Sequence, residues 1–330
     1  MSATLVIGGS GFVGKALVPA LVAAGHEVRA TTRDLSRGAK TPHVEWVRCD
    51  VNDSTDVERA LDGIDVAYFL VHGMGGSQHD YAAMERRVAC QLAEAAGRAG
   101  LKRIIYLGGV APREKASTHL KSRLDVGELL RAGPVPTLEL RASMIIGNGS
   151  VSWQIVRDLA MRLPAMLLPS WTASRTCPVA IEDVIVALVR GLELELPASA
   201  WYDIPGPEVI SGRELLARVA ALRGRKVPSV RVPFLSVSLS SWWLRLVTRA
   251  NFALARELVL GFTSDLLPHD ARYWTEIGYQ PTWTIDAAAR AALGHEIKES
   301  NMRGFLANFE ESMVQRISPK IDNSTSRGPR

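Results

Sequence analysis

Short runs of hydrophobic residues alternate with longer segments of helical periodicity through the first half of the chain. Short apolar runs that end at glycine or at polar turns predict strands, whereas apolar positions that recur on one face of a helix predict helices. The pattern predicts strands over residues 4–9, 27–33, 44–51, 65–71, 102–109 and 136–146, and helices over residues 13–25, 54–63, 81–100 and 118–133. Ser54 is the expected N-cap of the second helix. Such alternation predicts crossover units, and therefore an α/β fold in which residues 1–150 form a Rossmann domain with a doubly wound parallel sheet.

The pattern changes after residue 150. Helical segments at residues 153–163, 181–194 and 211–224 are separated by proline-rich links, and seven of the eight tryptophans lie from Trp153 onward. We expect residues 151–295 to form a smaller, mainly helical, substrate-binding part on the carboxyl edge of the sheet. We expect the tail over residues 296–330 to combine an amphipathic helix, suited to docking on the body or on a partner, with a polar end of disordered composition.

The stretch LVIGGSGFVGKAL at residues 5–17 contains two phosphate-binding patterns. Read from Gly9, it resembles the start of a P-loop, but Ala16 stands where a Ser or Thr would hold Mg²⁺. Read from Gly8, it is the G-x-x-G-x-x-G turn that joins a strand to a helix in dinucleotide-binding domains, where the helix N-terminus binds a diphosphate. We expect no metal site. We expect five residues of this turn to bind the dinucleotide: Gly8, Gly11, Phe12, Val13 and Gly14.

The ends of the second and third predicted strands indicate which dinucleotide is bound. NAD-binding domains usually place an acidic residue after the second strand, whereas this chain has Arg33 there, followed by Arg37. A guanidinium binds a 2′-phosphate through two hydrogen bonds, so we expect NADP(H) in preference to NAD(H). A solvated basic loop is the alternative. Asp50 and Val51, after the third strand, are expected at the adenine, although a simple loop cap would also explain Asp50.

Seven segments in order resemble the extended and atypical short-chain dehydrogenase/reductases: GGSGFVG, CDVND, YFLVHGMG, RIIYLGGV, HLKSRLDVGELL, LRASMIIGNGS and CPVAIEDV. The chain is most similar to the NmrA-like NAD(P)H-binding, epimerase-like oxidoreductases, specifically up to about residue 185 and loosely to about residue 295. The resemblance implies that the nicotinamide lies along the ends of the fourth to sixth strands. It implies eight further cofactor neighbours: Leu70, Val71, His72, Gly108, Gly109, Ala142, Ser143 and Met144.

The catalytic pattern of that family is altered in this chain. Classical members have a Ser after the fifth strand and a Tyr-x-x-x-Lys on the next helix, in which the Lys holds the ribose and lowers the pKa of the Tyr. Here Gly108-Gly109 stands at the Ser position, His119 at the Tyr position and Arg123 at the Lys position. A spacing of four keeps both side chains on one helix face, so Arg123 can still donate to the ribose hydroxyls. His119 is the expected acid or base near neutrality, and the neighbouring guanidinium should lower its pKa. The alternative is that His119 is an ordinary helix residue, while Arg123 anchors the cofactor or pairs with Asp125 or Glu128.

Other residues compete for these roles. His72 and Tyr81 lie after the fourth strand and are alternative proton donors, although structural roles would also explain them. The aromatic and Met-rich second half suggests an apolar or aromatic substrate, but filling of the core of the smaller part is the preferred explanation. Trp242 and Trp243 beside Arg245 suggest a membrane-interface patch, a weaker interpretation.

Composition narrows the class of protein. The 330 residues are 47% hydrophobic and 22% charged, as in an ordinary globular protein. The net charge of +5 is spread over interspersed residues, which disfavours nucleic-acid binding. No apolar run is long enough to span a bilayer, no signal peptide precedes the first strand, and the three cysteines are widely separated. We therefore expect a cytoplasmic protein without a transmembrane segment.

These features predict an NADP(H)-dependent oxidoreductase that reduces a carbonyl or an activated double bond of a small, fairly hydrophobic molecule. The alternative is a non-catalytic NAD(P)H sensor or assembly subunit, because Ser, Tyr and Lys are all replaced. Sugar-nucleotide epimerisation is disfavoured, since it normally uses the Tyr twice per cycle. A homodimer is compatible with the sequence.

Overall fold

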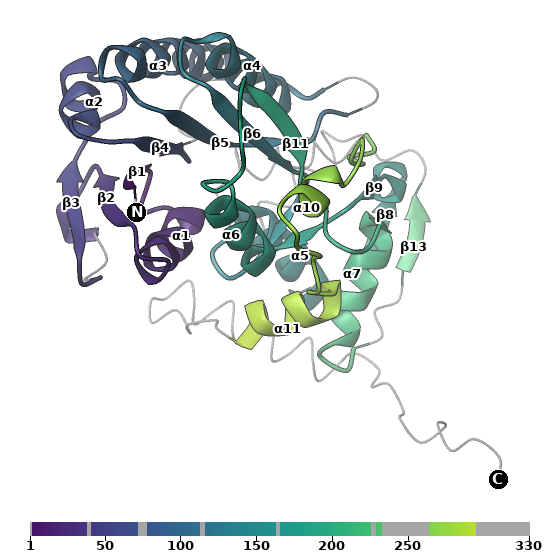
Figure 1. Ribbon diagram of the computed structural model, residues 1–330. Helices are drawn as coiled ribbons and strands as arrows, with labels where there is room; N and C mark the ends of the chain where they lie inside the picture. The colour runs from purple at the N-terminus through teal and green to yellow at the C-terminus, as the bar shows by residue number, and fades with distance from the viewer. Residues whose placement is uncertain are drawn as a thin grey trace.

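The computed structural model describes residues 2–37, 41–71, 78–112, 116–162, 166–225, 229–232 and 264–294 (Figure 1). Seven parallel strands form its main sheet in the order β11-β6-β5-β4-β1-β2-β3. These are β1 (Ala3–Ile7), β2 (Glu27–Thr32), β3 (Val44–Arg48), β4 (Val66–Phe69), β5 (Arg103–Gly109), β6 (Thr137–Ala142) and β11 (Ala200–Asp203). The strand order reverses between β1 and β4, and open α/β sheets bind their ligands beside such a reversal. The predicted Rossmann sheet is confirmed.

Helices cover both faces of this sheet. In Figure 1, α3 (Gln78–Arg98) and α4 (Thr118–Ala132) lie above it with α2 (Ser54–Leu61), whereas α1 (Phe12–Ala23) and α6 (Ile181–Arg190) lie below it. Successive strand residues point to opposite faces, so Ile104 and Tyr106 pack in the upper core while Ile105 and Leu107 pack in the lower one. Continuous burial on both faces explains why the central strands β1, β4 and β5 read as apolar runs.

Two local expectations differ from the structure. Asp53, not Ser54, is the N-cap of α2, because the Asp53 carboxylate accepts hydrogen bonds from the N–H groups of Thr55 and Asp56, and Ser54 is the first helical residue. The third helix begins at Gln78, before the apolar periodicity that started the prediction at residue 81.

The chain after residue 150 contributes to two cores. The helices α5 (Val151–Arg162), α7 (Gly212–Ala221) and α11 (Ile285–Gly294) share a core of their own. Around them lie three short strand pairs: β7 (Ile145–Ile146) with β10 (Val179–Ala180), β9 (Arg175–Thr176) with β12 (Ile210–Ser211), and β8 (Met166–Pro169) with β13 (Ser229–Val232). In contrast, α6, β11 and α10 (Arg272–Glu276) return to the main sheet. The chain thus crosses back to the Rossmann core after residue 150.

The tryptophans described after residue 150 include core residues. Trp153 is 1% exposed and Trp274 is 4% exposed. At these two positions the structure supports core filling. Among the described residues, no helix combines the length and apolarity needed to cross a bilayer.

Candidate cofactor and active site

The glycine turn between β1 and α1 has the backbone geometry that a diphosphate needs. Gly8 has a φ of +92°, which favours glycine, and Gly11 N–H donates to Gly8 O at 2.9 Å. A Cβ at Gly14 would collide with Gly8 O and would lie 2.7 Å from Gly9 Cα, so α1 approaches the turn as closely as glycine allows. The first turn of α1 carries no acidic residue, and no side chain caps it. Its N–H groups are therefore free to bind an anion, and the cradle fits a dinucleotide diphosphate.

Neighbouring segments hold this turn in place. A Cβ at Gly8 would lie 3.1 Å from Val71 Cγ2, and Leu70 N–H donates to Ile7 O at 3.0 Å, so the end of β4 adjoins the turn. Phe12 packs against the loop that follows β7, where a Cβ at Gly147 would lie 2.8 Å from Phe12 Cζ. The neighbouring Val13 is partly buried against the lower core.

Arg33 and Asp50 lie close together after β2 and β3. Asp50 Oδ1 accepts hydrogen bonds from the backbone N–H and the side-chain amide of Asn52, at 3.0 and 2.9 Å. These two bonds lower the pKa of Asp50, and the nearby Arg33 guanidinium lowers it further. Within the described part of the chain, no hydrogen bond or ion pair holds the exposed Arg33 side chain, and no donor bonds Asp50 Oδ2. Arg37 ends the short 3₁₀ helix η1 (Leu35–Arg37), and its side chain lies outside the described residues.

Two polar residues that line a cavity next to Val51 were missed by the sequence analysis. A cavity of about 30 Å³ lies between Val51 and Val71 and reaches Glu85 and Tyr106. Ser122 Oγ of α4 donates to Glu85 Oε2, and Tyr106 OH donates to Arg123 O at 3.1 Å. Burial raises the pKa of Tyr106 well above its ordinary value, so its phenol stays protonated. The sequence signal for this pair was Glu85, a charged residue on a helix face of α3 that is otherwise mostly apolar.

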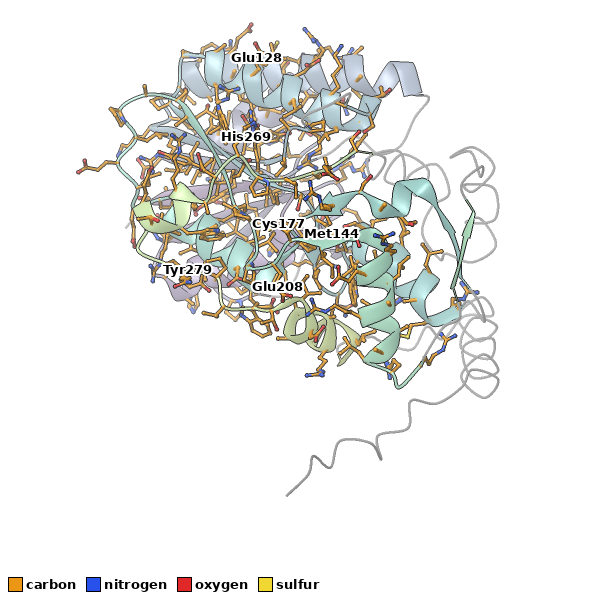
Figure 2. All side chains as sticks on the ribbon, turned by 90° about the vertical axis from the view of Figure 1, so that its right-hand side faces the viewer. Glu128, Met144, Cys177, Glu208, His269 and Tyr279 are labelled. Carbon is orange, nitrogen blue, oxygen red and sulfur yellow. The ribbon has the colours of Figure 1, made fainter. Side chains whose placement is uncertain are left out.

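The expected nicotinamide wall is built from the ends of β5 and β6. The strand register pairs Gly109 with Ala142. Beyond β6, Ser143 Oγ donates to Cys177 O at 2.7 Å and Met144 O accepts from Val179 N–H at 2.9 Å. Figure 2 shows Met144 and Cys177 next to each other. Burial raises the pKa of Cys177 to about 11, so this thiol is no nucleophile at neutral pH.

His119 and Arg123 lie in the first two turns of α4. Arg123 Nη2 donates to Leu107 O at 2.7 Å, whereas its Nε is buried with no partner in the described structure. A Cβ at Gly109 would lie 3.4 Å from that Nε. Asp125 pairs with Arg86 at 2.9 Å and not with Arg123. The unpaired Nε beside Gly109 is a donor that suits a ribose hydroxyl, so the site fits the nicotinamide half of a dinucleotide.

The pKa of His119 differs from the expectation of titration near neutrality. Burial lowers the pKa, and the Arg123 guanidinium lowers it further, to about 4. The direction was expected from Arg123, but burial is the larger cause and was not visible in the sequence. His119 is therefore neutral at pH 7, and a neutral imidazole carries an N–H group but no imidazolium proton to transfer.

Several sequence expectations lie outside the described residues. These are His72, the side chain of Tyr81, Trp242, Trp243 and the tail over residues 296–330.

Comparisons with known proteins agree with this geometry. The sequence pattern of the NAD(P)H-binding family matches residues 8–161. A 3 beta-hydroxysteroid dehydrogenase/Delta 5-->4-isomerase of Mycobacterium tuberculosis is 34% identical over 111 residues, which cover 31% of this chain and 30% of that protein. The match thus spans under a third of that relative. A 3-diazoavenalumate denitrifying reductase of Streptomyces sp is 24% identical over 278 residues, covering 73% of this chain and 88% of that protein.

The fold is also that of solved epimerases. The UDP-glucuronic acid 4-epimerase from Bacillus cereus in complex with NAD matches with a TM-score of 0.68 and 17% identity, covering 94% of this chain and 99% of that one. At this identity the similarity concerns the fold. Residues 8–161, which contain the glycine turn and the His119–Arg123 helix, match the NAD(P)H-binding family, and the chain has an epimerase-like Rossmann fold.

Proposed function

We propose that this protein is an NADP(H)-dependent oxidoreductase that reduces a carbonyl or an activated double bond of a small, fairly hydrophobic molecule. The observation that carries the proposal is the position of Arg123 of α4 beside Gly109 at the end of β5, with His119 one helical turn before Arg123 and close enough for the guanidinium to lower the His119 pKa. A guanidinium thus adjoins the strand end at which the family is expected to place its nicotinamide, and an imidazole lies on the neighbouring turn of the same helix. The glycine turn supplies the binding site for the diphosphate on the neighbouring strand.

Each part of the coenzyme has a protein group suited to it. The N–H groups after Gly11 bind the diphosphate, and the unrestrained Arg33 guanidinium binds the 2′-phosphate. Asp50 Oδ2 accepts from the adenine amino group. Arg123 Nε donates to the nicotinamide ribose, in place of the usual Lys.

The chemistry follows from the His119 imidazole, which is neutral near pH 7, and from the neighbouring Arg123 guanidinium. When bound, the reduced nicotinamide supplies a hydride. The carbonyl oxygen of the substrate then gains negative charge, which the neutral His119 N–H and the Arg123 guanidinium stabilise. Because the pKa of His119 is about 4, the proton that completes the reduction comes from water. Titration of His119 should therefore change the reaction rate little between about pH 6 and pH 8.

The relatives guide the choice of substrate. One similar protein is named for a 3-hydroxysteroid and another for a diazo compound, so both classes belong in a panel with quinones, enones and aromatic aldehydes. NADPH consumption by the purified protein tests the proposal. His119→Asn should lower kcat by about tenfold or more, since it weakens a donor to a developing charge, whereas His43→Asn, at an exposed loop position, should not.

A non-catalytic NAD(P)H sensor is the second candidate. The glycines at the Ser position and the low pKa of His119 favour it, because a neutral His119 has no imidazolium proton to give at neutral pH. Tight NADPH binding without turnover of any compound in the panel would support the sensor and reject the reductase.

A further inference from the structure

A glutamate lies buried between the sheet and the helix that carries His119 and Arg123. Glu139 of β6 is 0% exposed. Its carboxylate occupies space that two glycines leave open: a Cβ at Gly108 of β5 would lie 2.9 Å from Glu139 Oε1, and a Cβ at Gly127 of α4 would collide with the same carboxylate and lie 2.6 Å from Oε2. Both β5 and α4 therefore approach the Glu139 carboxylate at a glycine, where no side chain intervenes.

Two arginines hold the carboxylate. Arg131 Nε of α4 donates to Oε2 at 2.8 Å. Arg141 of β6 donates from Nε to Oε1 at 2.8 Å and from Nη2 to Oε2 at 3.2 Å. The Arg141 guanidinium in turn stacks on the Trp201 ring, 4.2 Å from its centroid. Both carboxylate oxygens are thus bonded, which fixes the side chain and offsets the cost of burying its charge.

The spacing along α4 connects this clamp to the candidate site. Gly127 follows Arg123 by four residues and His119 by eight, so all three share the helix face that packs on the sheet. Glycine inside a helix lowers its stability, so a close approach is the reason that favours it here. The distance between α4 and β5 at Gly127 and Gly108 is set by the carboxylate between them.

We propose that Glu139, clamped by Arg131 and Arg141, is a positioning residue that sets how closely α4 approaches the end of β5, and thereby places His119 and Arg123. The role rests on the proposed function in so far as these two side chains serve the reaction. The geometric claim concerns this chain alone and is testable without coenzyme.

A double-mutant cycle between Glu139 and Gly127 tests the contact. Gly127→Ala alone should displace α4, weaken NADPH binding by about tenfold and move the His119 pKa toward 6.5, because a displaced helix exposes the imidazole. In a Glu139→Ala background the same Gly127→Ala substitution should cause no further change, since the colliding carboxylate is gone. Glu128→Ala, on the outer face of α4 in Figure 2, is the matched control and should leave both readings unchanged.

The readings are the NADPH dissociation constant and the His119 pKa from an NMR titration of labelled histidine. Equal effects of Gly127→Ala in both backgrounds, or a wild-type His119 pKa in folded Glu139→Ala protein, would overturn the proposal. If Glu139→Ala does not fold, Glu139→Gln keeps the shape while removing the charge. The amide should release Arg131 and shift the pKa of His119. An unchanged His119 pKa in Glu139→Gln would reject the positioning role of Glu139. Wild-type protein that binds no NADPH would contradict the proposed function and leave the His119 titration as a separate result.

Discussion

Replacing His119 by Asn should change how stability depends on pH. The unfolded chain titrates this imidazole near its ordinary pKa of 6.5, whereas in the folded protein burial and Arg123 hold the pKa at about 4. Between these values the unfolded state binds a proton that the folded state does not. The contribution of His119 to folding is therefore undisturbed above pH 6.5 and declines as the pH falls toward 4.

The size of the effect follows from the two pKa values. One pKa unit corresponds to about 1.4 kcal/mol, so the complete loss is about 3.4 kcal/mol, of which about 2.5 kcal/mol has developed by about pH 4.5. Asn cannot titrate, so His119→Asn should lose about 2.5 kcal/mol less than wild type between about pH 7.5 and pH 4.5. Any fixed cost of the substitution cancels in this difference.

Urea unfolding, followed by fluorescence at both pH values, measures this difference in the free energy of unfolding. The m-value of each transition should be the same in both proteins. His43→Asn is the control, because His43 is exposed and has a φ of +62°, which Asn tolerates. If wild type and His119→Asn lose the same stability on acidification, His119 is not buried beside Arg123 as described, and the argument for a neutral imidazole at pH 7 fails.

Two further predictions concern the turn and the thiols. Gly14→Ala should weaken NADPH binding by at least about tenfold in calorimetry, because its Cβ would collide with the backbone of the turn, whereas Gly294→Ala meets no described atom within 4 Å and should bind as wild type. Iodoacetamide at about pH 8 should label Cys90, which is exposed, long before Cys49 or Cys177, whose pKa values burial raises to about 11. Mass spectrometry that finds fast labelling at either buried thiol would contradict the described packing.

The Rossmann sheet could be predicted because its signals are local. The strands β1, β4 and β5 are apolar runs between turns, and the glycine turn lies where a strand meets a helix. The seventh strand, β11, escaped prediction, because its sequence AWYD is short and ends on a buried Asp203. Only pairing with β6, about 60 residues earlier along the chain, makes it a strand.

In the candidate site, too, local features could be predicted from the sequence and features that depend on packing could not. The spacing of His119 and Arg123 predicted one helix face, and the neighbouring guanidinium predicted the direction of the pKa change. The size of that pKa change depends on how deeply His119 is buried between elements distant in sequence, and the sequence alone does not reveal this burial. Glu139 was passed over for the same reason: within TLELRA it reads as a polar position in a strand, and only the structure brings it against Gly127.

Isothermal titration of wild-type protein and Arg33→Ala with NADPH and NADH tests the central claim that the glycine turn binds a nicotinamide dinucleotide and Arg33 its extra phosphate. Wild type should bind both coenzymes, with NADPH tighter by about tenfold or more, and Arg33→Ala should lose that difference while it still binds NADH. Folded protein that gives no binding heat with either coenzyme would contradict the account, and an equal loss of both in Arg33→Ala would remove Arg33 from the 2′-phosphate.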